Sequence, residues 1–150
     1  MKKFHFSLET VLDYKNQALD ALRAEHGAIL AQVRAQEQVI ENLETEYRQV
    51  DEEFTQRKLE GINVLDAMSF EQYLRSMERK LQEEYRKLDR LRRREEEKRT
   101  QVVEARKETA TIEKLKEHKL EDYRKAEQKD QEQQIEEFVS TTRAMAAMGI

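Results

Sequence analysis

The side chains of this sequence that could do chemistry are three histidines and a large number of carboxylates. His5, His26 and His118 are far apart in the sequence, and none belongs to a metal-binding or nucleophile motif. The chain also has no Gly-rich phosphate loop and no cysteine. Catalysis needs convergent groups within hydrogen-bond reach of one another. The sequence therefore predicts no enzyme activity, no catalytic residue, no metal site and no cofactor.

A basic run at Arg92–Arg94 is a candidate for nucleic-acid binding. It is followed directly by Glu95–Glu97, and no aromatic side chain interleaves with it to stack on bases. The chain carries 28 Lys and Arg against 32 Asp and Glu, a net charge of -4, whereas a nucleic-acid binder is expected to be basic. The alternating blocks are typical of a solvated helix face, so we expect no nucleic-acid partner.

The composition favours long helices over a globular core. Of the 150 residues, 40% are charged and none is proline, and glutamate, lysine, arginine, glutamine, alanine and leucine dominate. The same composition also occurs in disordered chains, but those do not keep apolar residues in a regular register. No apolar run approaches the roughly 20 residues of a membrane helix, and no signal peptide is recognisable. We expect a cytoplasmic protein without membrane insertion.

The N-terminal half carries a helical stripe of apolar residues. From Leu8 to Phe54, alternating steps of four and three residues meet an apolar side chain at most positions. Such a repeat keeps one narrow stripe facing a second helix. Ser7 is a candidate N-cap, so the pattern predicts a helix over about 8–58.

A second stripe follows the glycine at position 61. The same repeat resumes at Phe70, just after Ser69, which has the residue type of a helix N-cap. The predicted tip of the turn covers about 59–68, and the second helix covers about 69–140.

The two stripes match one another if the chain turns back once. Antiparallel partners then share a constant sum of residue numbers, and Phe54 with Phe70 has the same sum as Leu43 with Leu81. Further pairs with this sum are Val50 with Leu74, Tyr47 with Met77, Leu22 with Val102, Leu19 with Ala105, and Leu12 with Ile112. The sequence therefore predicts an all-α fold, a long antiparallel two-helix coiled coil, as a single hairpin over 1–150. A slip of one heptad remains an alternative.

The centre of the predicted pair is more polar than its ends. Polar residues in such a seam cost stability, so we expect the ends to pack better than the middle. Four central layers each place a polar side chain in the seam: Ile40 faces Glu84, Gln36 faces Leu88, Ile29 faces Glu95, and His26 faces Lys98.

The C-terminal residues have no partner in the first helix. From about residue 117 onward the second helix should protrude as an unpaired end. It carries apolar residues on one face, among them Ile135, Phe138, Val139 and Met145. A partner that covers this face and a frayed tail are the two interpretations.

Three segments resemble the FliJ family of small coiled-coil proteins from the bacterial flagellar type III export apparatus. They are Phe4–Lys15 (FHFSLETVLDYK), Ser69–Met77 (SFEQYLRSM) and Lys129–Val139 (KDQEQQIEEFV). The resemblance spans essentially the whole chain. It implies an antiparallel two-helix coiled coil and a role in flagellum biogenesis, and hence in motility and chemotaxis.

The resemblance also implies partners. Family members bind the hexameric ring of the export ATPase FliI, promote its assembly, and contact the export gate protein FlhA. Contacts with the ATPase regulator FliH and with export chaperones are implied as well, with a location in the cytoplasm at the membrane of the flagellar base. From the residues alone, a purely structural coiled-coil scaffold or adaptor without an ATPase partner is the alternative.

Two sets of site residues follow from the resemblance. The gate-binding positions fall on Tyr73, Met77, Lys80 and Glu84, of which the last two are charged where better-known relatives carry a small residue and a histidine. The paired termini are expected to enter the ATPase ring, and the residues assigned to that contact are Leu8, Leu12, Leu19, Leu115, Leu120, Tyr123, Phe138 and Val139.

Overall fold

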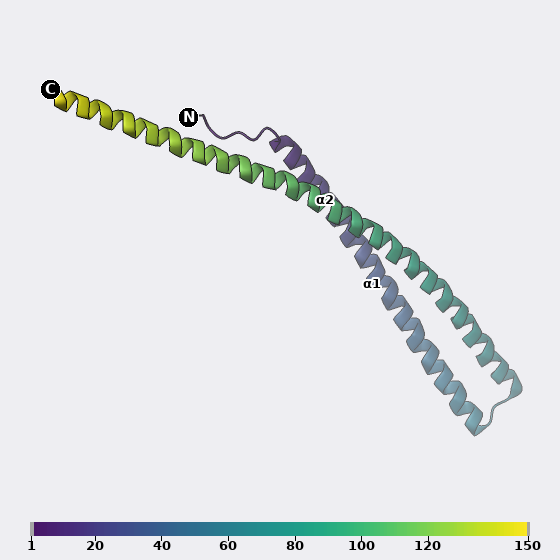
Figure 1. Ribbon diagram of the computed structural model, residues 1–150. Coiled ribbons are helices and arrows are strands. Elements are labelled where there is room, and N and C mark those ends of the chain that lie inside the picture. Colours follow the sequence, from purple (N-terminus) through teal and green to yellow (C-terminus); the bar gives the residue numbers. More distant parts are fainter. Residues whose placement is uncertain (1, 150) are drawn as a thin grey trace. The chain divides into compact units, whose positions relative to one another are not determined.

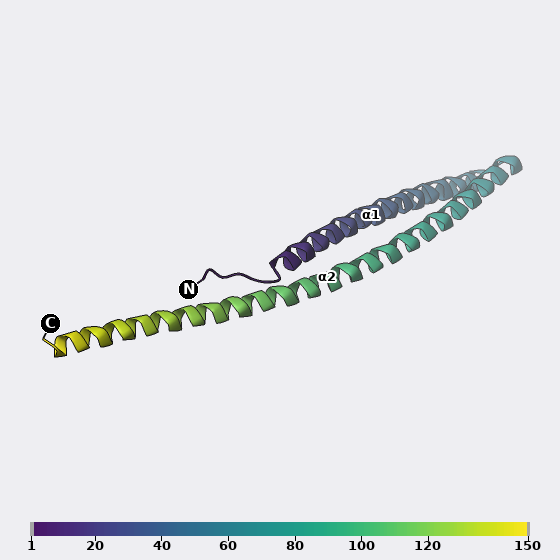
Figure 2. The ribbon, with the colours of Figure 1, turned by 90° about the horizontal axis from the view of Figure 1, so that it is seen from above.

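The computed structural model describes residues 2–149, which form two long helices and no strand (Figure 1). Helix α1 spans Glu9–Glu60 and helix α2 spans Val64–Ala147. The helices are antiparallel and are joined by the short connection 61–63 (Figures 1 and 2). The predicted all-α fold, an antiparallel helical hairpin, is confirmed.

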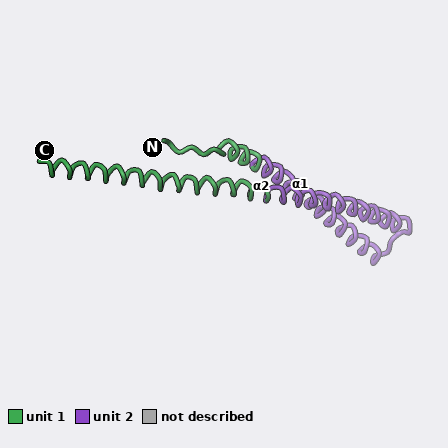
Figure 3. The backbone as a smooth tube through the Cα atoms, turned by 45° about the horizontal axis from the view of Figure 1, so that its top comes forward, with its two compact units in different colours: residues 1–19, 104–150 green, residues 20–103 purple. Residues whose placement is uncertain are grey.

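Contacts divide the chain into two compact units (Figure 3). Unit 1 combines Met1–Leu19 with Glu104–Ile150, and unit 2 comprises Asp20–Val103. Each unit is built from one segment of α1 and one antiparallel segment of α2. One domain over the whole chain stays a prediction.

The buried side chains of the helices lie on the predicted stripes. Each stripe therefore faces the other helix, as a four-three repeat requires. Phe54 and Phe70, one of the predicted pairs, stack with ring centroids 5.1 Å apart and planes at 2°. The buried residues of the two stripes are Leu12, Leu19, Ile29, Val33, Ile40, Phe54, Leu74, Met77, Glu84, Leu88 and Thr109.

The middle of the seam is better packed than the sequence predicts. Ile29, Val33, Ile40 and Leu88 form a cluster of buried apolar side chains in unit 2. Leu88 is 3% exposed, the lowest value in the described apolar core. The expectation of a weakly packed centre is therefore wrong. The polar side chains at the centre of the seam form hydrogen bonds to residues one layer away on the opposite helix, as described below. The apolar side chains there therefore pack against one another.

The second helix begins five residues earlier than predicted. Asn63 is its N-cap, because its side-chain oxygen accepts a hydrogen bond from the backbone N–H of Leu65 at 2.9 Å. Ser69 lies inside the helix, where its hydroxyl donates to the carbonyl of Leu65 at 3.1 Å. The predicted tip at 59–68 is therefore too long.

The other helix ends also differ from the prediction. Helix α1 begins at Glu9, whose backbone N–H donates to the carbonyl of Phe6 at 3.1 Å. Helix α2 continues to Ala147, seven residues past the predicted end at 140. The polar tail is compatible with helix because it contains no proline and no glycine before Gly149.

Gly61 ends α1 in a backbone conformation that favours glycine, with φ at 98°. Gly61→Ala is expected to lower the free energy of unfolding by about 1–2 kcal/mol, the cost of a positive φ for a residue with a Cβ. Gly27→Ala is the matched control, because Gly27 lies inside α1 with open space where a Cβ would be. That exchange should raise stability by about 0.5–1 kcal/mol. Urea unfolding of both variants checks the opposite signs.

Candidate functional site

In unit 2, polar side chains of the seam form hydrogen bonds across to the opposite helix, one layer away from the residue that they face. The Gln36 amide donates to the backbone carbonyl of Glu84 at 3.0 Å and also to its carboxylate. Lys87 adds an ion pair to the same carboxylate at 3.3 Å. The Gln36 hydrogen bond lowers the pKa of Glu84, and Lys87 lowers it further against the opposing effect of desolvation. Glu84, at 9% exposed, thus remains ionised in the seam.

His26 has a carboxylate partner that the sequence register did not predict. Its Nε2 lies 2.9 Å from an oxygen of Glu95, and both side chains are largely covered. Lys98, the expected partner of His26, instead pairs with Glu25 at 2.8 Å. His26 thus reaches the residue one layer along the seam, and Lys98 reaches the residue next to its expected partner.

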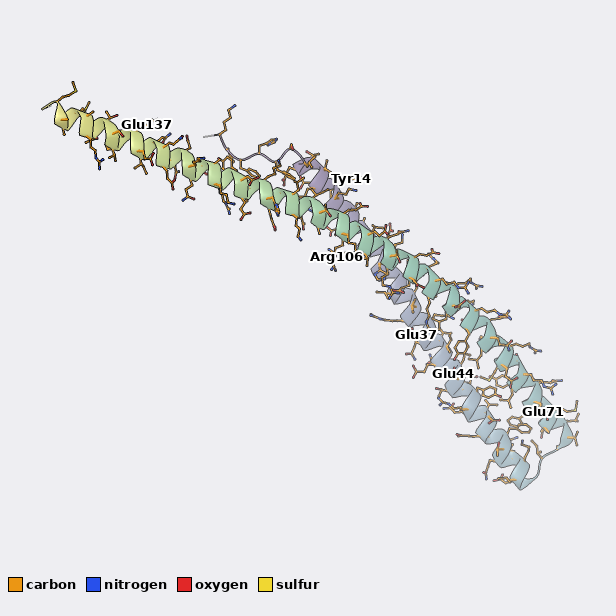
Figure 4. All side chains as sticks on the ribbon, in the orientation of Figure 1. Tyr14, Glu37, Glu44, Glu71, Arg106 and Glu137 are labelled. Carbon is orange, nitrogen blue, oxygen red and sulfur yellow. The ribbon has the colours of Figure 1, made fainter. Side chains whose placement is uncertain are left out.

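Three tyrosines link the two helices in unit 2 by hydrogen bonds. Each donates its hydroxyl to a glutamate on the opposite helix, and these bonds bridge α1 and α2 on both sides of the stripe. The bonds run from Tyr47 to Glu78 at 2.7 Å, from Tyr73 to Glu46 at 2.6 Å, and from Tyr85 to Glu44, which Figure 4 shows on α1. The sequence register placed Tyr47 in the seam opposite Met77 and predicted none of these three hydrogen bonds.

These hydrogen bonds raise the pKa of each tyrosine above its ordinary value of 10.0, because ionisation would place a phenolate against a carboxylate. The bonds therefore contribute stability below pH 10, and the contribution is lost as pH rises through the raised pKa. In an alkaline titration followed by absorbance, we expect these three tyrosines to ionise at a higher pH than a tyrosine with the ordinary pKa of 10.0. Glu46→Gln should move the pKa of Tyr73 back toward 10.0, and an unchanged titration would contradict this assignment.

The expected gate-binding residues divide into exposed and buried members. Tyr73 is 46% exposed and Lys80 is also exposed, so both are accessible on α2. Met77 is 5% exposed and Glu84 is 9% exposed, because both face α1 across the seam. A partner that docks on the closed helix pair can contact Tyr73 and Lys80. Met77 and Glu84 are covered by α1 and would contribute only by packing beneath these exposed residues.

A groove of about 350 Å³ lies beside Tyr73 in unit 2. Phe70 and Val50 give it an apolar floor, and Arg57 lies over the Phe70 ring at 5.5 Å. The remaining lining residues are Glu53, Asp66 and Ser69. Its combination of an aromatic surface and charged rims suits a peptide segment better than a small apolar ligand. Sequence reasoning missed Arg57, whose role appears only when the two helices meet.

The expected ring-binding residues also divide by exposure. Within unit 1, Leu12 and Leu19 are each 5% exposed and are covered by the helix pair itself. Three others are well exposed: Leu115 at 41%, Phe138 at 72% and Val139 at 40%. The half-buried members are Leu8, Leu120 and Tyr123. A partner can therefore contact the tail directly, while Leu12 and Leu19 hold the termini together.

The residues before α1 pack on α2 as an N-terminal arm, defined here as residues 2–7. The Phe4 ring contacts the Tyr123 ring with centroids 5.5 Å apart, and the Tyr123 hydroxyl donates to the backbone carbonyl of Lys2. Phe6 is 6% exposed. Two ion pairs continue the contact along the helices, Glu9 with Lys116 at 2.8 Å and Lys15 with Glu108 at 2.9 Å. The arm thus closes this end of unit 1.

The C-terminal tail, defined here as residues 131–147 of α2, has no described neighbour. Figures 1 and 2 show no other described segment beside it, and Figure 4 shows Glu137 on it. Every residue in it is exposed. Its apolar side chains on the surface are Ile135, Phe138, Val139 and Met145. Large exposed apolar residues on one helix segment are typical of a contact surface.

Other candidate sites from the sequence find no support in the described part of the chain. Arg92 pairs with Glu37 at 3.7 Å and Arg93 with Asp89 at 2.9 Å, so the basic run is partly neutralised. Residues 2–149 hold no group of three or more side chains suited to a metal ion. Neither helix of the structure is long and apolar enough to span a membrane.

Two antiparallel helices that meet along one four-three seam define a coiled-coil hairpin protein. The pattern of the family described as flagellar FliJ protein matches residues 4–146, and the chain belongs to this family. The family is a non-catalytic component of flagellar protein export. Comparisons with curated proteins and with solved structures give no match.

Proposed function

We propose that this protein is a coupling stalk of the flagellar export apparatus, which binds the ring of the export ATPase and the export gate. Membership of the FliJ family supports a role in flagellar export. The observation that carries the finer proposal is the tail, in which every residue is exposed and whose apolar face lies against no other described segment (Figures 1 and 2). The protein would act in the cytoplasm, held at the flagellar base by these partners.

The ring contact is assigned to the tail and the adjoining part of unit 1. Phe138 and Val139 offer apolar surface, and Leu115 extends it along α2. The closed end formed by Phe4 and Tyr123 keeps this part of α2 attached to the N-terminus. A single helix supported in this way can insert along the axis of a ring and present different faces to different subunits.

The stalk would act by binding and not by chemistry. A protein shifts its partner between two states only by the difference in its affinity for them. Inserted along the axis of the hexamer, the tail would present a different face to each subunit, favour different states in different subunits, and so promote assembly and ATP turnover. FliH and export chaperones would be further partners of the same complex.

The gate contact is assigned to Tyr73, Lys80 and the groove beside Tyr73. Tyr73→Ala should leave helicity almost unchanged, because the side chain is 46% exposed, and should weaken gate binding by about tenfold or more. Tyr85→Ala is the matched control, since Tyr85 is 48% exposed and makes the same kind of bond to a glutamate. Calorimetric titration with the soluble part of FlhA measures both. Equal losses in the two variants would argue against a gate site at Tyr73.

The direct test of the proposal is to add the intact chain to the purified export ATPase. We expect a larger hexamer fraction in sedimentation and a higher rate of ATP hydrolysis. If neither quantity changes at saturating chain, the stalk proposal fails and a structural scaffold without an ATPase partner is favoured.

A further inference from the structure

The N-terminal arm and α2 form a basic groove in unit 1, and the function proposed above uses only Phe4 and Tyr123 of its lining. Its volume is about 570 Å³. Its lining combines three lysines, a histidine and three aromatic rings with one carboxylate and the hydroxyls of Ser7 and Tyr123. The lining residues are Lys2, Lys3, Phe4, His5, Phe6, Ser7, Lys119, Asp122 and Tyr123.

The chemistry of this groove selects an acidic partner that also has apolar side chains. Lys2, Lys3 and Lys119 outnumber Asp122, and His5 adds a positive charge when it is protonated. The Phe4 and Tyr123 rings, in contact at 5.5 Å, supply an apolar wall. A small inorganic anion would leave this wall uncovered, whereas a helix that carries glutamates beside apolar residues would cover it.

The tail of the same protein has this complementary chemistry. Residues 131–142 contain three glutamates and no basic residue, and Ile135, Phe138 and Val139 are exposed among them. Glu132 lies three residues before Ile135 and Glu136 three residues before Val139, so on the helix each of these glutamates neighbours an exposed apolar side chain. The groove and the tail are thus opposite in charge and alike in their exposed apolar character.

A chain cannot place its own tail in its own groove. Tyr123 and Glu137 belong to the same uninterrupted helix α2, and a separation of 14 positions holds them about 21 Å apart. The occupant must come from another molecule. We propose that two copies of this chain associate through their C-terminal helices, each tail seated in the basic groove of the other.

Two-fold symmetry follows from this exchange. If the tail of one copy fills the groove of the second, the tail of the second can fill the groove of the first, and the contact closes as a dimer. The contact also uses Phe138 and Val139, which the proposed ring contact requires. The dimer and the ring-bound stalk would therefore exclude one another, and the dimer would be the form of the protein away from the ATPase.

The first measurement is the mass of the purified full chain by sedimentation equilibrium over a range of concentrations. We expect a reversible dimer with twice the mass of the chain. Added salt should weaken it, because screening acts on the lysine–glutamate contacts. A chain that stays monomeric at every concentration would overturn the proposal, whatever its effect on the ATPase.

A charge exchange tests the contact itself. Variant A carries Lys3→Glu with Lys119→Glu in the groove, and variant B carries Glu132→Lys with Glu136→Lys in the tail. Each alone juxtaposes like charges twice in a dimer, so its dissociation constant should rise at least about tenfold. An equimolar mixture of A and B should form a heterodimer, because both of its contacts are again between opposite charges.

A matched control reverses two other exposed lysines of unit 1. Lys107→Glu with Lys114→Glu changes the net charge as much as variant A but lies outside the groove, and should leave the dimer intact. Circular dichroism of all variants verifies that they stay helical. Failure of A and B to form a heterodimer would overturn the proposal. So would a monomer that binds vesicles containing phosphatidylglycerol through Lys3 and Lys119, since the groove would then serve a lipid surface.

Discussion

Replacement of Leu88 by aspartate is expected to abolish the cooperative thermal unfolding of the chain. Leu88 is 3% exposed and packs in the cluster formed with Ile29, Val33 and Ile40. An aspartate there would lose the apolar contacts and place an unpaired carboxylate in the seam, which together cost more than about 4 kcal/mol. Domains of this size are stable by about 5–15 kcal/mol, so the loss would remove a large part of the total.

The matched control places the same exchange at an exposed leucine. Leu65 is 70% exposed in the first turn of α2, where the helix dipole tolerates a negative charge. Leu65→Asp should therefore unfold at nearly the temperature of the parent chain. Circular dichroism with temperature compares the three proteins, and a Leu88→Asp chain as stable as its control would mean that the observed seam is not the core.

Removal of two apolar side chains of the tail is expected to shift stimulation of the export ATPase to much higher concentrations of the chain while leaving the fold unchanged. Phe138 is 72% exposed and Val139 is 40% exposed, so Phe138→Ala with Val139→Ala costs little stability. The few residues that dominate an interface cost about 2 kcal/mol or more when truncated, and we assign one such loss to this pair. The half-maximal concentration of chain in the ATPase assay should therefore rise by about thirtyfold or more.

Leu59→Ala is the control for this loss of apolar surface. Leu59 is 79% exposed in the last turn of α1 and belongs to unit 2, apart from the tail. The control chain should stimulate ATP hydrolysis as the parent does. If both variants lost the same activity, the loss would reflect nonspecific apolar contacts of the chain and not a specific contact made by the tail.

The seam was predictable because apolar periodicity is a local property of the sequence. The four-three repeat identified both stripes, and Phe54 with Phe70 confirms one pair of the proposed register. The helix ends were less predictable, because several residue types can cap a helix. Ser69 has the residue type of a cap, but Asn63 makes the bond, directly after the positive φ of Gly61.

The polar contacts could not be read from the register. His26 and Gln36 reach one layer along the seam, to Glu95 and Glu84, and such reach depends on rotamers that a sequence does not specify. The same limit applies to the candidate sites. Burial separates Tyr73, which is accessible, from Met77, which faces α1, although both occur in the same short segment.

The N-terminal arm has no periodicity at all, so its packing could not be predicted. Its contact with Tyr123 depends on where the start of α1 meets α2. The basic groove is therefore visible only in the structure, since Lys3 and Lys119 are more than a hundred residues apart in the sequence.

Site-specific cross-linking most directly tests the claim that the tail of this chain enters the ATPase ring. A photoreactive amino acid is placed at position 138 or at position 59, and each chain is irradiated in complex with the assembled FliI hexamer. The stalk proposal predicts covalent adducts with the ATPase from position 138 and none from position 59. Adducts from position 59 with none from position 138 would contradict it.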